Sequence, residues 1–335
     1  MRIVLDAMGS DSAPGVDVEG GVRAARRFGQ EVILVGRESE IKAELDKHNT
    51  QGLNLEIVHA DEVIEMNEHP AQAVRSKPNS SMVVGMKLLK DGQADAFASA
   101  GNSGGVLASS LASAGRIGRI KGVQRPALAT ILPTGPSTMG FMLDIGANTD
   151  CKPQWLAQFA IMGSIYAEKV LGIANPRVGL MANGSEEGKG NLQVQAAHEL
   201  IKQLNLNFIG NVEGTDLAKG STDVIVTDGF VGNVAVKTAE GVASLLLSVI
   251  RREIKARPVA VLGGLLAKPA FGRVARTVDP FEVGGGPLLG VNGVVIVAHG
   301  RSNARAIKNA IGQARKAVQG GVVEAIRTGL ANQEE

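Results

Sequence analysis

The residues best suited to chemistry fall in six short turns, each of which follows a predicted β-strand. The turns are rich in Gly, Asn, Ser and Asp, and Gly lets backbone approach a ligand closely. Several turns place Asn or Ser just before a predicted helix, where unpaired N–H groups favour an anion such as phosphate. The six turns are Asp6–Asp11, Gly101–Gly105, Asp144–Asn148, Asn183–Glu186, Asp228–Asn233 and His299–Asn303.

A parallel sheet would bring these turns together. In an open parallel sheet the carboxyl ends of all strands lie on one edge, where ligands bind. A single turn of this kind needs no explanation beyond helix capping. Six of them favour one polar cleft.

One turn also matches a catalytic motif. Gly101–Gly105 has the pattern G-x-S-x-G between a predicted strand and a predicted helix, and Asp228 and His299 follow in the order used by α/β-hydrolases. The pattern predicts a serine esterase or thioesterase with Ser103 as nucleophile. A Gly- and Ser-rich turn can equally cradle phosphate, so the motif alone leaves both interpretations open. A non-catalytic protein that binds anions or docks on membranes is a third hypothesis.

The sequence does not match the stricter motifs for nucleotide cofactors or for metals. Gly184–Gly190 resembles a P-loop, but its first Gly is one residue too close to the Gly-Lys pair and no Ser or Thr follows Lys189. Gly284–Pro287 lacks the spacing of a dinucleotide fingerprint. The five histidines show no zinc-site spacing. We therefore predict neither a metal nor a cofactor.

Composition narrows the class of protein. The chain has 335 residues with 35 Lys and Arg against 33 Asp and Glu, so its net charge of +2 provides no field typical of a nucleic-acid binder. A single Cys, Cys151, cannot form an internal disulfide and suits a reducing cytoplasm. The opening Met1–Asp6 does not look like a secretory signal. We also expect no membrane-spanning helix, because the uncharged apolar runs fall short of about 20 residues.

Short β-branched runs alternate with helical periodicity, which is typical of βα units and a mostly parallel sheet. We predict an α/β fold with helices on both faces of the sheet, as a single unit over residues 1–335 with two closely joined lobes around a cleft. Strands are predicted at 3–6, 32–35, 55–59, 94–99, 127–132, 141–145, 178–181, 207–210, 224–227 and 294–298. Helices are predicted at 16–28, 41–48, 81–90, 106–114, 154–171, 192–204, 234–255 and 304–327.

Residues 251–286 interrupt this rhythm with frequent Pro and Gly, so we expect an irregular, hairpin-like excursion there. Basic residues surround apolar ones in the segment, a combination that suits an acidic protein or an anionic lipid surface. A solvated basic helix end followed by an apolar dimer contact fits the pattern equally well. The candidate docking residues are Arg251, Arg252, Lys255, Leu262, Leu265 and Leu266.

Taken as blocks, the turns resemble the bacterial phosphate acyltransferases of phospholipid synthesis, the PlsX family. The resemblance covers nearly the whole chain, and the blocks follow the family's order. They are Val4–Pro14, Ser99–Gly105, Leu143–Asn148, Asn183–Gly190, Asp228–Asn233 and His299–Gly300. Arg301 stands where the family does not fix a residue, so we assign it no catalytic role.

The resemblance implies transfer of a long-chain acyl group from acyl carrier protein to inorganic phosphate. The acyl phosphate product would then serve a downstream glycerol-phosphate acyltransferase. The resemblance also implies a fold similar to isocitrate and isopropylmalate dehydrogenases, a homodimer, no cofactor, and a cytoplasmic enzyme with peripheral membrane contact.

Such a site must hold phosphate and stabilise an oxyanion, and His299 could protonate the leaving thiolate or orient phosphate. Bare carboxylates would repel phosphate, so each acid must be paired or turned aside, and a turn-capping role fits each acid as well as a catalytic one. The candidate catalytic residues are His299, Asp228, Asn233, Lys189 and Asp144. The candidate substrate- or phosphate-binding residues are Asp6, Gly9, Ser10, Gly101, Asn102, Ser103, Gly104, Asn148, Asn183, Gly229 and Gly232.

Overall fold

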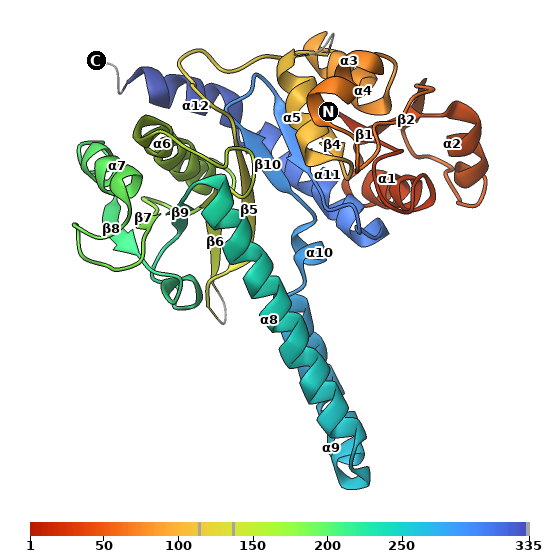
Figure 1. The fold of residues 1–335 in the computed structure, drawn as a ribbon. Coiled ribbons are helices and arrows are strands. Elements are labelled where there is room, and N and C mark those ends of the chain that lie inside the picture. Colours follow the sequence, from red (N-terminus) through yellow and green to blue (C-terminus); the bar gives the residue numbers. More distant parts are fainter. Residues whose placement is uncertain (113–114, 136–137, 333–335) are drawn as a thin grey trace.

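The computed structural model describes residues 1–112, 115–135 and 138–332 and shows one open α/β sheet covered by helices (Figure 1). Its eleven strands have the order β3-β2-β1-β4-β11-β10-β5-β6-β9-β7-β8. The strands are β1 (Arg2–Asp6), β2 (Glu31–Gly36), β3 (Leu55–His59), β4 (Ala96–Ser99), β5 (Ala127–Pro133), β6 (Met139–Leu143), β7 (Val178–Met181), β8 (Phe208–Val212), β9 (Val224–Val226), β10 (Gly286–Leu289) and β11 (Val294–Val297).

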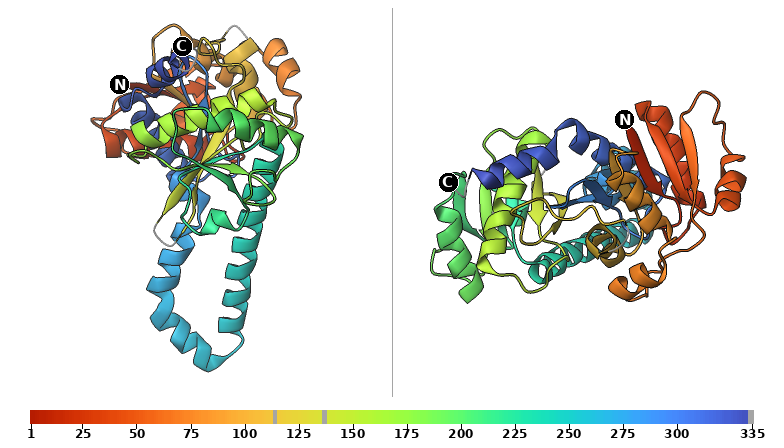
Figure 2. Two further views of the ribbon diagram at one scale, coloured as in Figure 1. Left: turned by 90° about the vertical axis from the view of Figure 1, so that its left-hand side faces the viewer. Right: turned by 90° about the horizontal axis from the view of Figure 1, so that it is seen from above.

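Helices cover both faces of this sheet (Figure 2). Among the described residues they are α1 (Gly15–Phe28), α2 (Glu38–Leu45), α3 (Pro70–Ser76), α4 (Ser81–Lys90), α5 (Ser103–Ala112), α6 (Pro153–Lys169), α7 (Leu192–Lys202), α8 (Gly229–Lys255), α9 (Pro258–Thr277), α10 (Pro280–Val283), α11 (Ala304–Gln319) and α12 (Val322–Ala331), with a short 3-10 helix at Asp216–Ala218.

The central β-branched runs predicted as strands, such as β1, β4, β7, β9 and β11, are buried on both sides, as a covered parallel sheet requires, whereas the edge strands β3 and β8 are partly exposed. In β1, Ile3 and Leu5 belong to the core cluster that includes Ile307 of α11, whereas Val4 packs into the cluster that includes Met82 of α4. Successive side chains of a strand point to opposite faces, so each strand joins two cores. The predicted fold class is confirmed.

The expectation that all carboxyl ends share one edge is wrong. Strands β3, β2, β1, β4 and β11 are mutually parallel, as are β6, β9, β7 and β8. Three antiparallel pairings separate the two groups, namely β11 with β10, β10 with β5 and β5 with β6. The groups therefore run in opposite directions. The unpredicted strand β10 is part of this reversal.

The segment expected to be irregular is helical instead. Helices α8 and α9 form a long arm that projects from the body of the molecule (Figures 1 and 2). Pro258 occupies the first turn of α9, where its missing N–H costs no hydrogen bond, although Pro269 lies inside the helix. Gly264 allows close packing, since a Cβ there would lie 2.6 Å from Ile254 of α8. Pro258 and Gly264 thus serve a helix start and a helix contact.

By length and composition alone, helix α8 could cross a membrane, with a window of mean hydropathy 1.4, and the expectation that the chain does not cross a membrane stays a prediction. At most two charged residues fall within that window. The helix lies exposed in the arm, and its first turns carry Lys237 beside His299. Length and composition alone are weak evidence for a membrane span.

A buried carboxyl group in α1 gives the first testable prediction. Asp17 is fully buried, its Oδ2 accepts a 2.6 Å hydrogen bond from Ser10 Oγ, and its Oδ1 has no hydrogen-bond partner among the described residues. Burial raises the pKa of Asp17 to about 8.

Between the unfolded pKa of about 4 and this folded value, the folded chain keeps a proton that the unfolded chain releases, so the free energy of unfolding falls as pH rises. Asp17→Asn should remove this dependence and raise the Tm at pH 8 by about 2 °C or more. Thermal unfolding at pH 5 and pH 8 measures the difference. Parallel pH profiles for both proteins would contradict the assignment.

Candidate active site

A cavity of about 420 Å³ gathers residues from five of the six predicted turns. Its polar rim combines Asp11, Gly101, Ser103, Gly146, Asn233, Lys237, His299 and Gly300, and part of its wall comes from β5 and from residues 280–286. The turns come from strands that run in opposite directions. Helix α8 joins them, because it starts after β9 and carries Lys237 to His299, which follows β11.

His299 and Lys237 form a pair of nitrogen groups in this cavity. His299 Nδ1 accepts a 3.2 Å hydrogen bond from the backbone N–H of Arg301, so the proton of the neutral ring belongs on Nε2. Nε2 lies 3.4 Å from Lys237 Nζ, which also contacts Glu240 Oε2 at 3.0 Å. The Nε2–H group of His299 and the ammonium group of Lys237 are therefore two neighbouring hydrogen-bond donors, and one anion can accept from both.

The electrostatics keep His299 neutral. Burial lowers the pKa of the imidazole, and the positive charges of Lys237 and Arg301 lower it further. A neutral ring can donate from Nε2–H and can take up a proton once a negative charge arrives. The pair therefore supplies one fixed positive charge and one titratable nitrogen.

The amino end of α5 lies at the same cavity. Asn102 caps the helix by accepting a 3.0 Å bond from the N–H of Gly105, and its amide donates to the carbonyl of Glu68 at 3.2 Å. Asn102 is therefore a buried positioning residue. Ser103, the first residue of α5, is exposed and lines the cavity. The N–H groups of a first helical turn lack partners within the helix and favour an anion.

Asp6 lies beneath the first two turns and does not line the cavity. It is fully buried, accepts a 2.7 Å bond from Ser99 Oγ, and receives the N–H of Met8 at 3.1 Å. Burial raises the pKa of Asp6. Gly9 brings the turns together, since a Cβ there would lie 2.8 Å from the N atom of Gly101. Ser10 is buried against Asp17, so Asp6, Gly9 and Ser10 shape the site from below.

Asp144 and Asn148 also serve the backbone of their turn. The Asp144 carboxylate accepts N–H bonds from Gly146, Ala147 and Asn148 at 2.8 to 3.0 Å. Burial raises the pKa of Asp144, and these bonds oppose the rise. The amide of Asn148 donates to Asp144 and to the carbonyl of Pro126. Both side chains are thus occupied, and Ile145 and Gly146 are the residues of the turn that line the cavity.

The turn before α8 caps the helix with Asp228, packs closely against the Asp144 turn at Gly232, and presents the amide of Asn233 to the cavity. Asp228 caps the helix by accepting a 2.8 Å bond from the N–H of Val231. Gly229 donates its N–H to the carbonyl of Asn148 at 2.7 Å. A Cβ on Gly232 would overlap the carbonyl oxygen of Asp144. Asn233 lines the cavity and donates to the carbonyl of Ile145 at 3.1 Å.

The turn after β7 does not reach the cavity. Asn183 Oδ1 accepts the N–H of Gly190 at 2.8 Å, and both Asn183 and Lys189 are exposed. Neither lines the cavity among the described residues. Because β7 lies two strands beyond β6 in the sheet, its turn is set apart from those that meet at His299.

A serine hydrolase triad is not assembled. Among the hydrogen bonds of the described chain, none joins Ser103 to His299 or His299 to Asp228. Asp228 is a helix cap, and the nitrogens of His299 face Arg301 and Lys237. Cys151 is no substitute nucleophile, since burial raises the pKa of its thiol to about 12.

Lys237 is the site residue that sequence reasoning missed. It lies four residues after Asn233 on α8, so the two side chains share one helix face. Val236 and Glu240 line the cavity from the same face. The helical spacing 233, 236, 237 and 240 is the signal that could have found it.

One group of possible metal ligands lies elsewhere. Ligand atoms of Glu187, His198 and Glu199 lie within 4.8 Å of one another. Lys202 Nζ, however, already contacts Glu187 Oε1 at 2.9 Å. An ammonium group thus supplies positive charge to this carboxylate.

Comparisons with known proteins agree on family and fold. A family model described as "Fatty acid synthesis protein" matches residues 1–325. A phosphate acyltransferase from Dictyoglomus turgidum is 50% identical over 331 residues, which cover 98% of each chain.

A phosphotransacetylase structure from Streptococcus pyogenes covers 97% of this chain and 94% of its own, with a TM-score of 0.62 and 20% identity. A Salmonella typhimurium structure described as a 4-hydroxythreonine-4-phosphate dehydrogenase covers 94% and 98%, with a TM-score of 0.52 and 12% identity. The two structures show a shared fold, and the expected likeness to dehydrogenases is confirmed at that level.

Proposed function

The chain belongs to the fatty acid synthesis family of its phosphate acyltransferase relatives, and from this premise we propose that it transfers a fatty acyl group from acyl carrier protein to inorganic phosphate. The product is an acyl phosphate for phospholipid synthesis. The single observation that carries the assignment to this cavity is the pair His299 and Lys237, 3.4 Å apart beside the amino end of α5.

The chemistry needs no covalent enzyme intermediate. Phosphate is already an anionic nucleophile at neutral pH, and a thiol with a pKa near 8.5 is a good leaving group. A phosphate oxygen attacks the thioester carbonyl, the C–S bond breaks, and the thiolate takes up a proton. Lys237 holds the phosphate charge while the N–H groups at the start of α5 and the amide of Asn233 are available to the oxyanion. His299 donates its Nε2 proton to the thiolate, and the proton that the attacking hydrogen phosphate gives up returns to Nε2 and restores the neutral ring.

Phosphate dependence of thiol release tests the proposal. With acyl carrier protein thioester as donor, free thiol should appear only when phosphate is present, in a one-to-one ratio with acyl phosphate. Sulfate is the matched anion control, because it fills an anion site but yields no stable acyl product. Thiol release at the same rate without phosphate would contradict the proposal.

The serine thioesterase alternative makes a different prediction. It requires an acyl-enzyme on Ser103 and complete loss of activity in Ser103→Ala. Among the described residues no hydrogen bond joins Ser103 to a base, so this variant should keep phosphate-dependent turnover within about tenfold of wild type.

The arm supports two finer proposals, a homodimer and peripheral contact of a cytoplasmic enzyme with membrane. The arm exposes large apolar side chains, with Leu266 85% and Leu262 67% accessible, a patch that a monomer rarely leaves uncovered. We assign the apolar face of α8, with Leu245 and Leu246, to a second copy of the chain. We assign the tip of the arm, with Leu262, Leu265 and Leu266, to membrane.

Two readouts separate these assignments. Changing Leu262, Leu265 and Leu266 to Glu should abolish sedimentation with phosphatidylglycerol vesicles and leave the molar mass in solution unchanged. Leu245→Glu with Leu246→Glu should instead halve the molar mass. Vesicle binding that survives the first set of changes would overturn the membrane assignment.

A downstream step follows from the product. An acyl phosphate is a mixed anhydride and an activated acyl donor. The reaction that consumes it is an acyl transfer, and we propose a glycerol-phosphate acyltransferase as the acceptor enzyme.

A further inference from the structure

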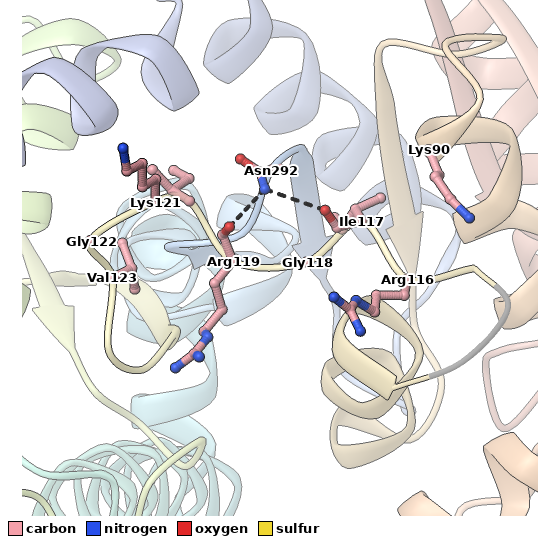
Figure 3. Close-up of a pocket in the computed structure, with 10 residues that line it drawn as sticks. Lys90, Arg116, Ile117, Gly118, Arg119, Lys121, Gly122, Val123 and Asn292 are labelled. Atoms are coloured by element: carbon pink, nitrogen blue, oxygen red, sulfur yellow. Dashed lines mark hydrogen bonds between the residues drawn. The ribbon is translucent and has the colours of Figure 1, made fainter.

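A second polar hollow lies outside the active-site cavity, around the loop that follows α5. It consists of a pocket of about 760 Å³, shown in Figure 3, and an adjoining pocket of about 610 Å³ that shares Arg116, Gly118 and Arg119 with it. We call it the basic groove. Its cationic lining residues are Lys90, Arg116, Arg119, Lys121, Arg125 and Lys152, all of them exposed. No Asp or Glu is among the described residues that line it.

The loop that carries three of these cations, Arg116, Arg119 and Lys121, is held in place by hydrogen bonds. The amide of Asn292 donates to the carbonyls of Arg119 at 2.7 Å and Ile117 at 3.3 Å (Figure 3). Gly118 donates its N–H to Ser110 at 3.0 Å, and Ile120 donates to Gly290 at 3.0 Å. The fold thus fixes the backbone of the loop and leaves its long basic side chains at the surface.

The positive side chains of the groove repel one another and attract an anionic partner. The whole chain carries a net charge of only +2, so the groove is a local feature rather than a general excess of base. Trp155, the single tryptophan, lines one end, with the Arg125 guanidinium 5.0 Å from its ring centroid. Trp155 is half-buried, and Arg and Trp side chains are frequent anchors of protein interfaces.

The groove lies close to the active site. Helix α5 links them, since Ser103 lines the active-site cavity and Leu111 lines the groove, about 12 Å apart at 1.5 Å per residue. The start of β5 makes a second link, because Pro126, just before the strand, lines the groove and Leu128, within it, lines the cavity.

We propose that the basic groove docks the acyl carrier protein. The inference rests on the proposed function, which requires a strongly acidic carrier protein to present its thioester at the cavity. The arm residues Arg251, Arg252 and Lys255 fit this partner less well. Arg251 lies fourteen residues beyond Lys237 on α8, about 21 Å along the helix. Arg252 is already paired with Glu253 at 3.1 Å.

Charge reversal in the groove tests the inference. Arg116, Lys121 and Lys152 are suited to it, because their side chains make no hydrogen bond or ion pair with other described residues. The triple change of these residues to Glu should raise the KM for acylated carrier protein by at least about tenfold with little change in kcat. The wild-type KM should also rise with ionic strength. Reversing Arg251, Arg252 and Lys255 is the matched comparison.

Two further readouts keep this result separate from the function itself. An acyl thioester of a small thiol, used with phosphate, should react equally well with wild type and the groove variant; failure of wild type with both donors would count against the proposed function alone. Direct binding of unacylated carrier protein, followed by fluorescence anisotropy, needs no turnover and should weaken at least about tenfold in the groove variant. Unchanged binding there, or a loss confined to the arm variant, would overturn the inference.

Discussion

Lys237→Met is expected to lower kcat/KM for phosphate by about 100-fold or more. The change removes the one fixed positive charge that faces His299 Nε2, at 3.4 Å, while it keeps the length of the side chain. Loss of a single charge-assisted donor at a developing anion costs about 10² to 10³ in rate. Initial rates at fixed acyl carrier protein and varied phosphate give the value.

The distribution of this loss between KM and kcat identifies the role of Lys237. A residue that only binds phosphate raises KM, whereas one that also stabilises the transition state lowers kcat. Lys169→Met, at the exposed end of α6, is the control and should change neither parameter. A loss of less than threefold in Lys237→Met would remove this lysine from the site.

Gly232→Ala is expected to be the most damaging single-atom addition in α8. A Cβ at this position would overlap the carbonyl oxygen of Asp144, and that turn cannot move freely because the Asp144 carboxylate binds its N–H groups. The amino end of α8 must then shift, and Asn233 and Lys237 shift with it. We expect a free energy of unfolding lower by about 2 kcal/mol or more, and activity reduced by about 100-fold.

Gly241→Ala is the matched control for this change. It lies in the same helix, and a Cβ there would meet no heavy atom within 4 Å. Because Ala is the better helix former by about 1 kcal/mol, this variant should be as stable as wild type or more stable. Thermal unfolding and kcat/KM of both variants show whether the close contact between Gly232 and Asp144 matters for stability and activity. Equal effects of the two changes would show that the contact with Asp144 is unimportant.

Much of the sheet could be predicted from the sequence, because strands buried on both faces, such as β1, leave continuous apolar runs. The reversal of strand direction could not. It depends on β10, whose residues Gly286 and Pro287 look like turn residues rather than a strand. Pro has no N–H to donate, yet β10 pairs with both β11 and β5.

The turns around the site were predictable as a set, but the roles of their side chains were not. Asp144, Asp228 and Asn102 have the residue types of catalysts, and each binds backbone N–H groups instead. A carboxylate near a strand end can act as a catalyst or can bind backbone N–H groups, and only the local geometry decides between these roles. Lys237 was overlooked because it lies on a helix face that becomes part of the site only once α8 is placed beside His299.

The arm shows the same limit of sequence patterns. Pro and Gly residues in 251–286 indicate breaks when each is considered alone. In the structure Pro258 starts α9 and Gly264 packs against Ile254. Pairing with α8 gives α9 contacts that its local sequence does not reveal.

The most direct test of the central claim is NMR of the His299 ring, labelled with ¹⁵N, while inorganic phosphate is added. The free enzyme should show a His299 pKa below its ordinary value, for the reasons of burial and the neighbouring Lys237 charge. Phosphate that binds to both Lys237 and His299 should shift the Nε2 resonance of His299 in a saturable manner. It should also raise the pKa of His299, because a nearby anion favours the imidazolium. Saturating phosphate that leaves both the resonance and the titration of His299 unchanged would contradict the account.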